Sequence, residues 1–474
     1  MAKTWNADIC VIGAGAAGLV VAAGASQMGA DVVLIEKGLM GGDCLNYGCV
    51  PSKALLAASR MAALAARAPA FGVTLGEPNI DFARVQQHVS EVVAGIAPTD
   101  SVERFTGLGV RVIEDDAVFV GPDAVRAGET TIRARRFVIA TGSRPAVPPA
   151  KGLDSVPYLT NETIFTNPGR PGHLLILGGG PIGMEMAQAH RDLGSAVTVV
   201  EMAAPLGRED PELVDILLTR LRARGIQIIA GAEAVEVAAR GEGVVLMVEE
   251  AAQRRELAGS HLLVASGRAA VVEGLDLEAA GVAYTEAGVQ VDQRLRTTNH
   301  KIFAIGDVTG APQFTHVASY HAGIALRNIL FYMPAKVNEH AIPRVTYTDP
   351  ELAHVGMTEA EARAAAGRIG VLRFPFAEND RAQTERDTDG LVKVVVGRRG
   401  RILGASILGA HAGDLIHPWV LAITAKLKMS AMAGAIVPYP TRTEVSKRAA
   451  GSYYQPALTS ARTKRIVRFL ARFA

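Results

Sequence analysis

Short runs of apolar residues that end at glycine turns set the pattern of the first part of the chain. Residues 9–12 (Ile-Cys-Val-Ile) have the length and composition of a buried strand, and a turn at residues 13–18 (Gly-Ala-Gly-Ala-Ala-Gly) follows directly. Small apolar residues come next, and a second apolar run at residues 32–35 ends at Glu36. The pattern predicts a strand, a tight turn, a helix and a second strand.

The same unit occurs again near the middle of the chain. Its first apolar run is residues 174–177, its turn is residues 178–183 (Gly-Gly-Gly-Pro-Ile-Gly), and its second run, residues 197–200, ends at Glu201. The acid follows the first glycine by 23 residues in both copies, since 36 − 13 and 201 − 178 are both 23. This spacing in a strand-helix-strand context indicates two dinucleotide-binding units.

Each glycine of such a turn has its own task. The first permits the tight turn, the second lets a pyrophosphate approach the backbone, and the third lets the helix pack closely on the strand. The glycines at these positions are Gly13, Gly15 and Gly18 in the first copy and Gly178, Gly180 and Gly183 in the second. The phosphates would lie at the helix N-terminus, and the acid would accept hydrogen bonds from a ribose. The alternative is a glycine-rich turn without a ligand.

The acid of the second unit favours NAD over NADP. Its carboxylate, Glu201, would repel a 2′-phosphate, and residues 202–204 (Met-Ala-Ala) contain no arginine that would attract one. Arg208 is the first arginine after it. We therefore predict NAD(H) as the nicotinamide, with NADP(H) as the alternative.

Further apolar runs divide the chain into domains. Residues 137–145 form a strand that ends in a turn before a proline-rich stretch, the pattern of a crossover between domains. Residues 262–268 repeat this strand and turn, and residues 302–307 predict a strand whose final acid, Asp307, would reach a bound cofactor. From about residue 343 the pattern changes to strands such as residues 391–396 followed by helices, which predicts a third domain.

Residues 9–30 carry no charge and have the length of a membrane span or an export signal. Glycines interrupt this stretch at positions 13, 15, 18, 24 and 29, which favours the strand, turn and helix instead. The composition, 49% apolar and 20% charged, is typical of a globular protein. The net charge of +2 gives no global field that would attract nucleic acid or anionic lipid, so only local patches could do so.

Three cysteines occur, Cys10, Cys44 and Cys49, too few for a secreted disulfide framework and typical of a reducing compartment such as the cytoplasm. Cys10 lies on the first predicted strand and is expected in the core. The other two lie five residues apart, just after the first dinucleotide-binding unit, where a thiol at a helix N-terminus near a cation stays a thiolate. We predict that this pair does redox work. Two core cysteines or half of a metal site are the alternatives, and the absence of a further cysteine or a nearby histidine argues against the metal.

The whole chain resembles the class I pyridine nucleotide-disulfide oxidoreductases, the group of dihydrolipoamide dehydrogenase, glutathione reductase and mercuric reductase. The resemblance rests on residues 41–53 (Gly-Gly-Asp-Cys-Leu-Asn-Tyr-Gly-Cys-Val-Pro-Ser-Lys), both glycine turns, and residues 140–142, 306–307 and 348–351. It implies an α/β fold with two Rossmann-like domains, one for FAD (residues 1–148 and 272–340) and one for NAD (residues 149–271). A C-terminal α+β interface domain (residues 341–474) would make a homodimer.

The resemblance also implies residue roles. Cys49 would be the sulfur beside the flavin, and Cys44 would attack the substrate. Lys53 would lie near flavin N5 and pair with Glu185, while Asp307 would bind the ribityl chain. The other residues that would contact the cofactors are Ala117, Thr141, Gly142, Ser143, Gly267 and His316, the last through its backbone. Electrons would pass from NADH to FAD, then to the disulfide of the cysteine pair, and then to an acceptor.

One run departs from the pattern of the disulfide-reducing members. They carry His-Pro-Thr-x-x-Glu, whose histidine protonates the leaving thiolate and whose acid orients that histidine. Residues 439–444 are Tyr-Pro-Thr-Arg-Thr-Glu, so Tyr439 replaces the histidine and Glu444 stays. A phenol with a pKa near 10 is a poorer proton shuttle at neutral pH than an imidazole near 6.5. Efficient lipoamide or glutathione turnover is therefore not expected, unless His411 or His417 substitutes; Tyr439 as an interface packing residue is the alternative role.

Three functions stay open. The first is an FAD-dependent NADH:disulfide or dithiol oxidoreductase similar to dihydrolipoamide dehydrogenase. The second is a metal-ion or quinone reductase, because mercuric reductase also has tyrosine in this region, although no cysteine follows Cys49 to supply its C-terminal thiol pair. The third is a flavin redox sensor with little turnover. No resident metal and no nucleic-acid partner are predicted.

The last residues combine basic and apolar side chains. The basic ones are Arg462, Lys464, Arg465, Arg468 and Arg472, and the apolar ones are Ile466, Val467, Phe469, Leu470 and Phe473. This composition predicts an amphipathic helix for a membrane surface or a partner. The shortness of the run favours a solvated helix on the dimer over a membrane contact.

Overall fold

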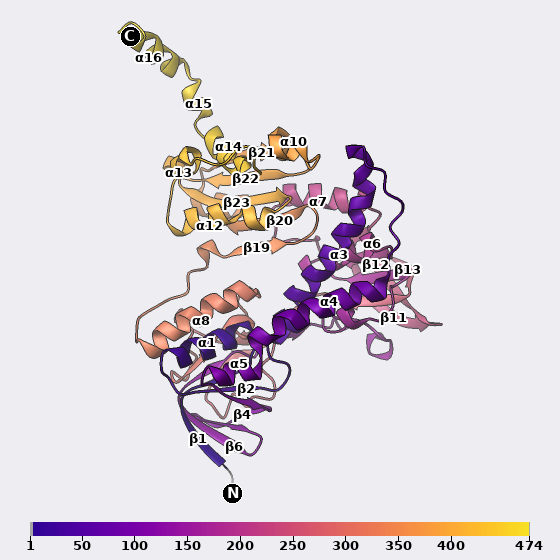
Figure 1. The fold of residues 1–474 in the computed structure, drawn as a ribbon, viewed down its shortest axis with the longest axis vertical. Coiled ribbons are helices and arrows are strands. Elements are labelled where there is room, and N and C mark those ends of the chain that lie inside the picture. The colour runs from indigo at the N-terminus through magenta and orange to yellow at the C-terminus, as the bar shows by residue number, and fades with distance from the viewer. Residues whose placement is uncertain (1–2, 474) are drawn as a thin grey trace. The chain divides into compact units, whose positions relative to one another are not determined.

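The structure is a computed structural model that describes residues 3–473 and divides into two compact units (Figure 1). Unit 1 consists of the described residues up to Gly179, Ala189–Met202 and Gly231–Val337. Unit 2 consists of Gly180–Gln188, Ala203–Ala230 and the described residues from Asn338 onwards. Helix α6 (Pro181–Asp192) passes from unit 2 to unit 1 along the chain.

Unit 1 is a mixture of strands and helices. Its strands are β1 (Lys3–Ile12), β2 (Val32–Glu36), β3 (Arg111–Glu114), β4 (Ala117–Gly121), β5 (Ala124–Ala127), β6 (Thr130–Ile139), β7 (Ser143–Pro145), β8 (His173–Leu177), β9 (Ala196–Glu201), β11 (Ala232–Arg240), β12 (Gly243–Glu250), β13 (Gln253–Gly259), β14 (His261–Val264), β15 (Arg268–Ala270), β16 (Tyr284–Thr285), β17 (Gly288–Val289) and β18 (Ile302–Ala304). Its helices are α1 (Ala16–Gln27), α2 (Gly42–Asn46), α3 (Cys49–Arg67), α4 (Phe82–Ile96), α5 (Val102–Gly107) and α8 (Thr315–Leu330).

Unit 2 carries the remaining elements. Its strands are β10 (Gln227–Ala230), β19 (Pro343–Thr346), β20 (Glu351–Gly356), β21 (Gly370–Pro375), β22 (Leu391–Val396) and β23 (Ile402–Gly409). Its helices are α7 (Pro211–Ala223), α9 (Glu359–Ala366), α10 (Asp380–Thr384), α11 (Ala412–Leu415), α12 (His417–Thr424), α13 (Met429–Gly434), α14 (Glu444–Ser452), α15 (Gln455–Leu458) and α16 (Ala461–Leu470).

The main sheet of unit 1 has the strand order β3-β2-β1-β6-β5-β4, with β18 beside β6. Strand β1 pairs in parallel with both β2 and β6, so that Val11 lies between Leu34 and Val138. Helix α1 is the crossover that parallel pairing of β1 and β2 requires. The strand, turn, helix and strand predicted for residues 9–36 are confirmed, and the membrane span considered for residues 9–30 is not present.

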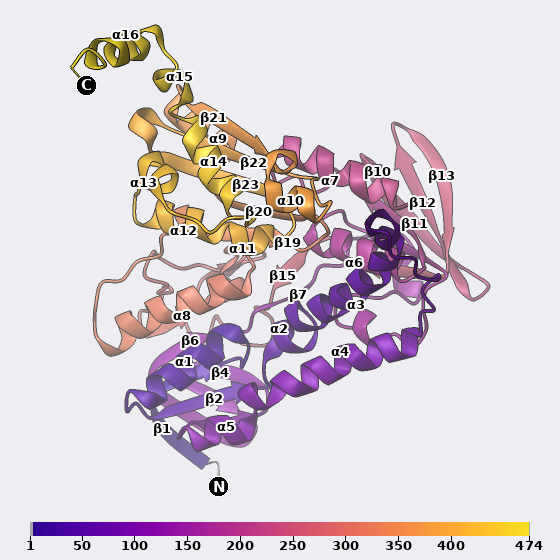
Figure 2. The ribbon, with the colours of Figure 1, turned by 45° about the horizontal axis from the view of Figure 1, so that its top comes forward.

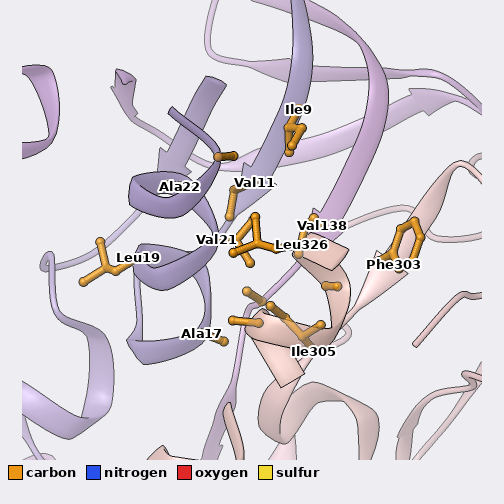
Figure 3. Close-up of a cluster of buried hydrophobic side chains, with 14 of the residues drawn as sticks. Ile9, Val11, Ala17, Leu19, Val21, Ala22, Val138, Phe303, Ile305 and Leu326 are labelled. Carbon is orange, nitrogen blue, oxygen red and sulfur yellow. The ribbon is translucent and has the colours of Figure 1, made fainter. Parts of the chain in front are cut away.

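Successive residues of β1 point to opposite faces of this sheet. Ile9 and Val11 belong to the core on one face, and Cys10 and Ile12 belong to the core on the other. Helices α1 and α8 cover the first face (Figure 3). Each buried aliphatic side chain contributes roughly 1.5–3 kcal/mol to such a core. Cys10 is fully buried, as the sequence predicts, and burial raises the pKa of its thiol.

The second strand-helix-strand unit is also present. Strand β8 pairs in parallel with β9 and with β14, in the register Leu175 with Thr198 and with Leu262. Strands β11, β12 and β13 form a separate antiparallel sheet. The strand predicted for residues 302–307 was wrong at its end: β18 stops at Ala304, because Gly306 has φ +73° and Gly306–Thr309 form a 3₁₀ turn.

Unit 2 contains an antiparallel sheet in the order β19-β20-β23-β22-β21, with its core around Trp419. All six residues of β22 are buried, including Lys393. The ammonium group of Lys393 lies 2.8 Å from Asp210, 3.0 Å from Glu212 and 2.9 Å from Glu359. A lysine is tolerated in this strand because the three carboxylates compensate its charge.

Candidate active site

The first glycine turn has the geometry that the sequence predicts. Gly13 has φ +102°, and a Cβ on it would overlap the carbonyl oxygen of Ala140. A Cβ on Gly18 would overlap the carbonyl oxygen of Gly13, so helix α1 packs directly on the turn. Gly15 is the N-cap of α1, and no described side chain caps this end. The N-terminus of α1 therefore presents backbone N–H groups without a side-chain cap, an arrangement that fits the pyrophosphate of a dinucleotide.

The second turn repeats this arrangement. Gly178 has φ +112°, and a Cβ there would overlap the carbonyl oxygen of Ala265. Ala265 occupies the place in its strand and turn that Ala140 occupies in the first copy. The duplication predicted from the two glycine turns therefore extends to the third strand of each unit.

The two acids predicted to bind ribose also hold the turns. The Glu36 carboxylate accepts hydrogen bonds from the backbone N–H of Ala14 at 2.5 Å and of Gly38 at 2.7 Å. Glu201 accepts one from the N–H of Gly179 at 2.6 Å, the equivalent place in the second copy. A carboxylate has about four lone-pair sites, so these bonds leave capacity for a hydroxyl. The ribose contacts stay predictions.

We expect Gly18→Ala to weaken folding and FAD retention. The added methyl would meet backbone atoms that cannot move away, and such overpacking costs about 1–3 kcal/mol. Thermal melting and the flavin-to-protein ratio of the purified enzyme measure the loss. Gly95→Ala is the matched control, because Gly95 lies in helix α4 with open space around it and should be unchanged or slightly stabilised.

The cysteine pair is anchored to the first glycine turn. The N–H of Gly41 donates to the carbonyl of Ala14 at 3.0 Å, and α2 starts one residue later. Cys44 lies within α2, and Cys49 is the first residue of α3. Both are free thiols in this structure, Cys44 half-buried and Cys49 exposed. The local fold therefore places the dithiol next to the first glycine turn.

The two sulfurs differ in acidity. Three groups lower the pKa of Cys49: the hydrogen bond from the Cys44 thiol is the largest cause, the Thr315 hydroxyl at 3.4 Å is the second, and the positive charge of Lys53 is the third. Desolvation opposes them. The hydrogen bond to Cys49, together with burial, raises the pKa of Cys44. Cys49 is thus the sulfur held as a thiolate at neutral pH, as the resemblance implies for the sulfur beside a flavin.

A pH titration of the reduced enzyme tests this assignment. Because the pKa of Cys49 is lowered to about 6, its thiolate should persist above that pH and be protonated as the pH falls below it. Thr315→Val removes one hydrogen bond to the charged sulfur, so the midpoint should move up by about one to two pH units. Thiolate absorbance against pH measures both midpoints. A midpoint that stays at about 6 in Thr315→Val would show that the hydroxyl does not stabilise the thiolate.

A polar network connects the dithiol segment to Asp307. The Ser143 hydroxyl donates to Asp307 at 2.6 Å, and the Arg268 guanidinium donates to the Ser143 hydroxyl at 2.7 Å and lies 3.0 Å from Asp43. Asn161 also donates to Asp43, at 2.9 Å. Desolvation raises the pKa of Asp307, opposed by its hydrogen bond from Ser143.

Sequence reasoning missed part of this network: Arg268 and Asn161 were not singled out, and neither was Thr315. A signal existed for Arg268, because it follows the strand-and-turn pattern that residues 262–268 share with residues 137–145. Asn161 and Thr315 had no such signal.

Other predicted contact residues lie around the same region of unit 1. Gly142 and Gly267 have φ of +71° and +148°, and the Thr141 hydroxyl donates to the carbonyl of Val271. The His316 ring stacks on Phe314 with centroids 5.2 Å apart. Ala117 packs its side chain in the core, so any cofactor contact it makes would use its backbone. Their roles toward a cofactor stay predictions.

Lys53 and Glu185 each have defined surroundings. The Lys53 ammonium donates to the hydroxyl of Ser52 at 3.3 Å. Glu185 is buried and accepts a hydrogen bond from the N–H of Tyr347 at 2.9 Å. The pairing of Lys53 with Glu185 stays a prediction.

The run at residues 439–444 lies in unit 2. Tyr439 is 69% exposed, and its hydroxyl donates to Asp380 at 3.1 Å. This hydrogen bond is the main cause that raises the pKa of Tyr439, which makes the phenol a weaker acid. One oxygen of Glu444, Oε2, is buried and has no hydrogen-bond partner among residues 3–473. His411 and His417 are exposed, just before α11 and at the start of α12.

Comparisons with known proteins agree with this architecture. Residues 7–322 match the family described as pyridine nucleotide-disulphide oxidoreductase, and residues 342–450 match its dimerisation domain. Mercuric reductase of Streptomyces lividans is 38% identical over 457 residues, which cover 94% of this chain and 96% of that protein. Dihydrolipoyl dehydrogenase of Geobacillus stearothermophilus is 36% identical over 452 residues, covering 94% and 95%.

Solved structures give the same result. The HOCl-induced flavoprotein disulfide reductase RclA from Escherichia coli has a TM-score of 0.84 and 31% identity, over 94% of this chain and 99% of that chain. Its Cu(II) complex has the same TM-score, over 93% of this chain. Together these findings define a flavoprotein disulfide oxidoreductase of the lipoamide dehydrogenase and mercuric reductase type. The chain belongs to the class I pyridine nucleotide-disulfide oxidoreductases, a family that binds FAD and uses NAD(P)H. The resemblance seen in the sequence is confirmed.

Proposed function

We propose that this protein uses NADH to reduce the Cys44–Cys49 disulfide and passes the electron pair to an acceptor at Cys44. The observation that carries the proposal is the dithiol beside the first glycine turn, with the pKa of Cys49 lowered and that of Cys44 raised. FAD, when bound, supplies the chemistry that converts hydride transfer from a nicotinamide into reduction of a disulfide.

Residues of this chain prepare the sulfurs for that chemistry. Reduction of the disulfide takes two electrons and leaves Cys49 as the thiolate, which Thr315 and Lys53 stabilise. Cys44 is protonated before the acceptor binds, because its pKa is raised, and a soft metal ion that binds this sulfur displaces the proton to solvent. The first glycine turn would hold the FAD pyrophosphate and Asp307 its ribityl chain, while the second turn with Glu201 would hold NADH. A homodimer through residues 342–450 is part of this proposal.

The acceptor we propose is a soft metal ion. The sequence favoured an organic disulfide over a metal ion as the acceptor. The surroundings of Tyr439 favour the metal ion instead. An organic disulfide leaves as two thiols, so the leaving thiolate needs a proton. Tyr439 is a poor source because its hydroxyl is bound to Asp380 and its pKa is raised. A metal ion that leaves after reduction needs no proton from the protein.

Electron balance is simple for a metal acceptor. One NADH supplies two electrons, which reduce one Hg²⁺ to Hg⁰ or two Cu²⁺ to Cu⁺. The two sulfurs of the reduced pair are the ligands we propose for this metal ion, since thiolates select soft metals.

An acceptor panel tests the proposal. The FAD-bound enzyme is reduced with NADH without oxygen and then mixed with Hg²⁺ or Cu²⁺ as thiol complexes, with lipoamide, with glutathione disulfide, or with a benzoquinone. We expect the metal ions to reoxidise the flavin over many turnovers and the two disulfides to do so slowly. Fast lipoamide turnover would overturn the metal proposal. Fast quinone turnover that survives in Cys44→Ser would overturn the role of the sulfurs.

A further inference from the structure

Helix α16 and the residues that follow it lie outside the part of the chain that matches the family. The match to the dimerisation domain ends at residue 450, and α16 begins at Ala461. Within unit 2, α15 and α16 lead away from the sheet of β19–β23 in both views (Figures 1 and 2). The fold of unit 2 therefore does not explain the sequence of this segment, which has its own pattern.

The segment has one apolar and one basic side. With 100° between successive helical residues, the apolar side chains of α16 fall within one half of the helix and three of its four basic ones within the opposite part, while Arg472 and Phe473 follow the helix. The apolar set is Ile466, Val467, Phe469, Leu470 and Phe473, and the basic set is Lys464, Arg465, Arg468 and Arg472, with Arg462 at the edge of the apolar side. The rings of Phe469 and Phe473 contact each other at 5.2 Å, which places them on one side.

The apolar side is open to solvent. Its five side chains are between 47% and 76% exposed. Five adjacent large apolar side chains on one exposed face mark an interaction surface rather than an ordinary solvated helix. The sequence predicts an amphipathic helix, and the structure shows in addition that unit 2 does not bury its apolar side.

The charge of the segment is strongly one-sided. Residues 451–474 contain five Lys and Arg and no Asp or Glu, whereas the rest of the chain has 49 − 5 = 44 basic and 47 acidic residues, a balance of −3. The positive field is therefore local to this helix. A second copy of the segment would offer the same cations and no carboxylate, and a nucleic acid would leave the apolar side unused.

We propose that residues 461–473 dock this protein on an anionic lipid surface, with the helix lying in the interface. The apolar side would enter the acyl boundary, and the basic side would contact anionic headgroups. Among residues 3–473 no helix has both the length and the apolar character to cross a bilayer. Ten helical residues span about 15 Å, half of the hydrocarbon thickness, so α16 would lie on the surface.

Vesicle co-sedimentation of the full-length, FAD-bound protein tests the proposal. We expect binding to vesicles of phosphatidylcholine with one quarter phosphatidylglycerol, and binding at least about tenfold weaker to pure phosphatidylcholine or in high salt. Phe469→Ser/Leu470→Ser and Arg465→Gln/Arg468→Gln should each lower binding about tenfold or more. Arg398→Gln/Arg399→Gln removes two exposed arginines elsewhere in unit 2 and should bind like the unchanged protein. Far-ultraviolet circular dichroism checks that every variant is folded.

Several outcomes would overturn the proposal. They are no binding to anionic vesicles, equal binding to both vesicle types, an equal loss in the Arg398/Arg399 control, or a self-association in lipid-free buffer that disappears in the Phe469/Leu470 variant. The last outcome would mean that a second copy covers this face. Because the assay measures sedimented protein rather than turnover, its result does not depend on the proposed acceptor.

Discussion

Cys49→Ser is expected to abolish NADH-driven turnover while FAD stays bound. The hydroxyl of serine cannot form the disulfide or be held as an anion at neutral pH, so the reduced pair is lost as an electron store. Removal of a covalent redox nucleophile costs about 10³–10⁶ in rate. Steady-state NADH oxidation with each acceptor measures the loss, and flavin absorbance confirms that the cofactor is retained. The long-wavelength absorbance of thiolate beside flavin should also be absent after reduction.

Two further cysteine variants sharpen this result. Cys44→Ser should lose turnover but keep the long-wavelength band, because Cys49 remains as a thiolate beside Thr315. Cys10→Ala is the matched control, since Cys10 is fully buried in the core of the main sheet and should leave turnover unchanged. An unchanged band in Cys49→Ser would mean that another sulfur lies beside the flavin, and the assignment of the pair would be wrong.

Local steric rules explain how far the sequence predicts the cofactor units. A side chain on Gly13 would overlap Ala140, and one on Gly18 would overlap Gly13. Because both positions need glycine, their spacing is enough to predict the strand, turn and helix. Gly178 of the second unit is required by the same kind of contact and was predicted in the same way. The sequence did not predict that Glu36 and Glu201 also accept hydrogen bonds from backbone N–H groups of the turns. A spacing of 23 residues is compatible with a ribose contact, with hydrogen bonds that hold the turn, or with both.

Long-range contacts explain what the sequence did not predict. Thr315 lies 3.4 Å from Cys49 although 266 residues separate them, and Arg268 reaches both Ser143 and Asp43. No local pattern encodes such proximity, because it depends on how β18 and α8 return to the first sheet. Part of the acidity of Cys49 therefore follows from tertiary structure. The rest comes from groups close in the sequence, the Cys44 thiol above all and the charge of Lys53.

Lys393 illustrates the same limit in unit 2. The run at residues 391–396 predicts a buried strand, and the strand is buried, yet a lysine lies in its middle. Its charge can be buried because three carboxylates surround it, those of Asp210 and Glu212 from the start of α7 and that of Glu359 from α9. Periodicity identifies the strand but gives no information about the ion cluster, since the partners of Lys393 come from two other segments.

Tyr439→His is expected to raise the rate of lipoamide and glutathione disulfide turnover by about 10²–10⁴. An imidazole with a pKa near 6.5 can give a proton to a leaving thiolate at neutral pH, whereas Tyr439 has a raised pKa and is bound to Asp380. The acid that would orient the imidazole is still in place: Glu444 Oε2 is buried without a hydrogen-bond partner among residues 3–473 and would accept its N–H. The gain is measured as kcat/KM for each disulfide.

The pH profile and a second variant separate proton transfer from packing. The histidine variant should acquire a dependence on a group with a pKa near 6.5 in disulfide turnover, and metal-ion turnover should change little because no leaving thiolate is protonated there. Tyr439→Phe keeps the ring, removes the hydroxyl, and should leave both activities unchanged. If Tyr439→Phe lost metal-ion turnover, the phenol itself would be a functional group. If Tyr439→His gained nothing, the missing imidazole would not be what limits disulfide reduction, and the preference for a metal acceptor would lose its physical basis.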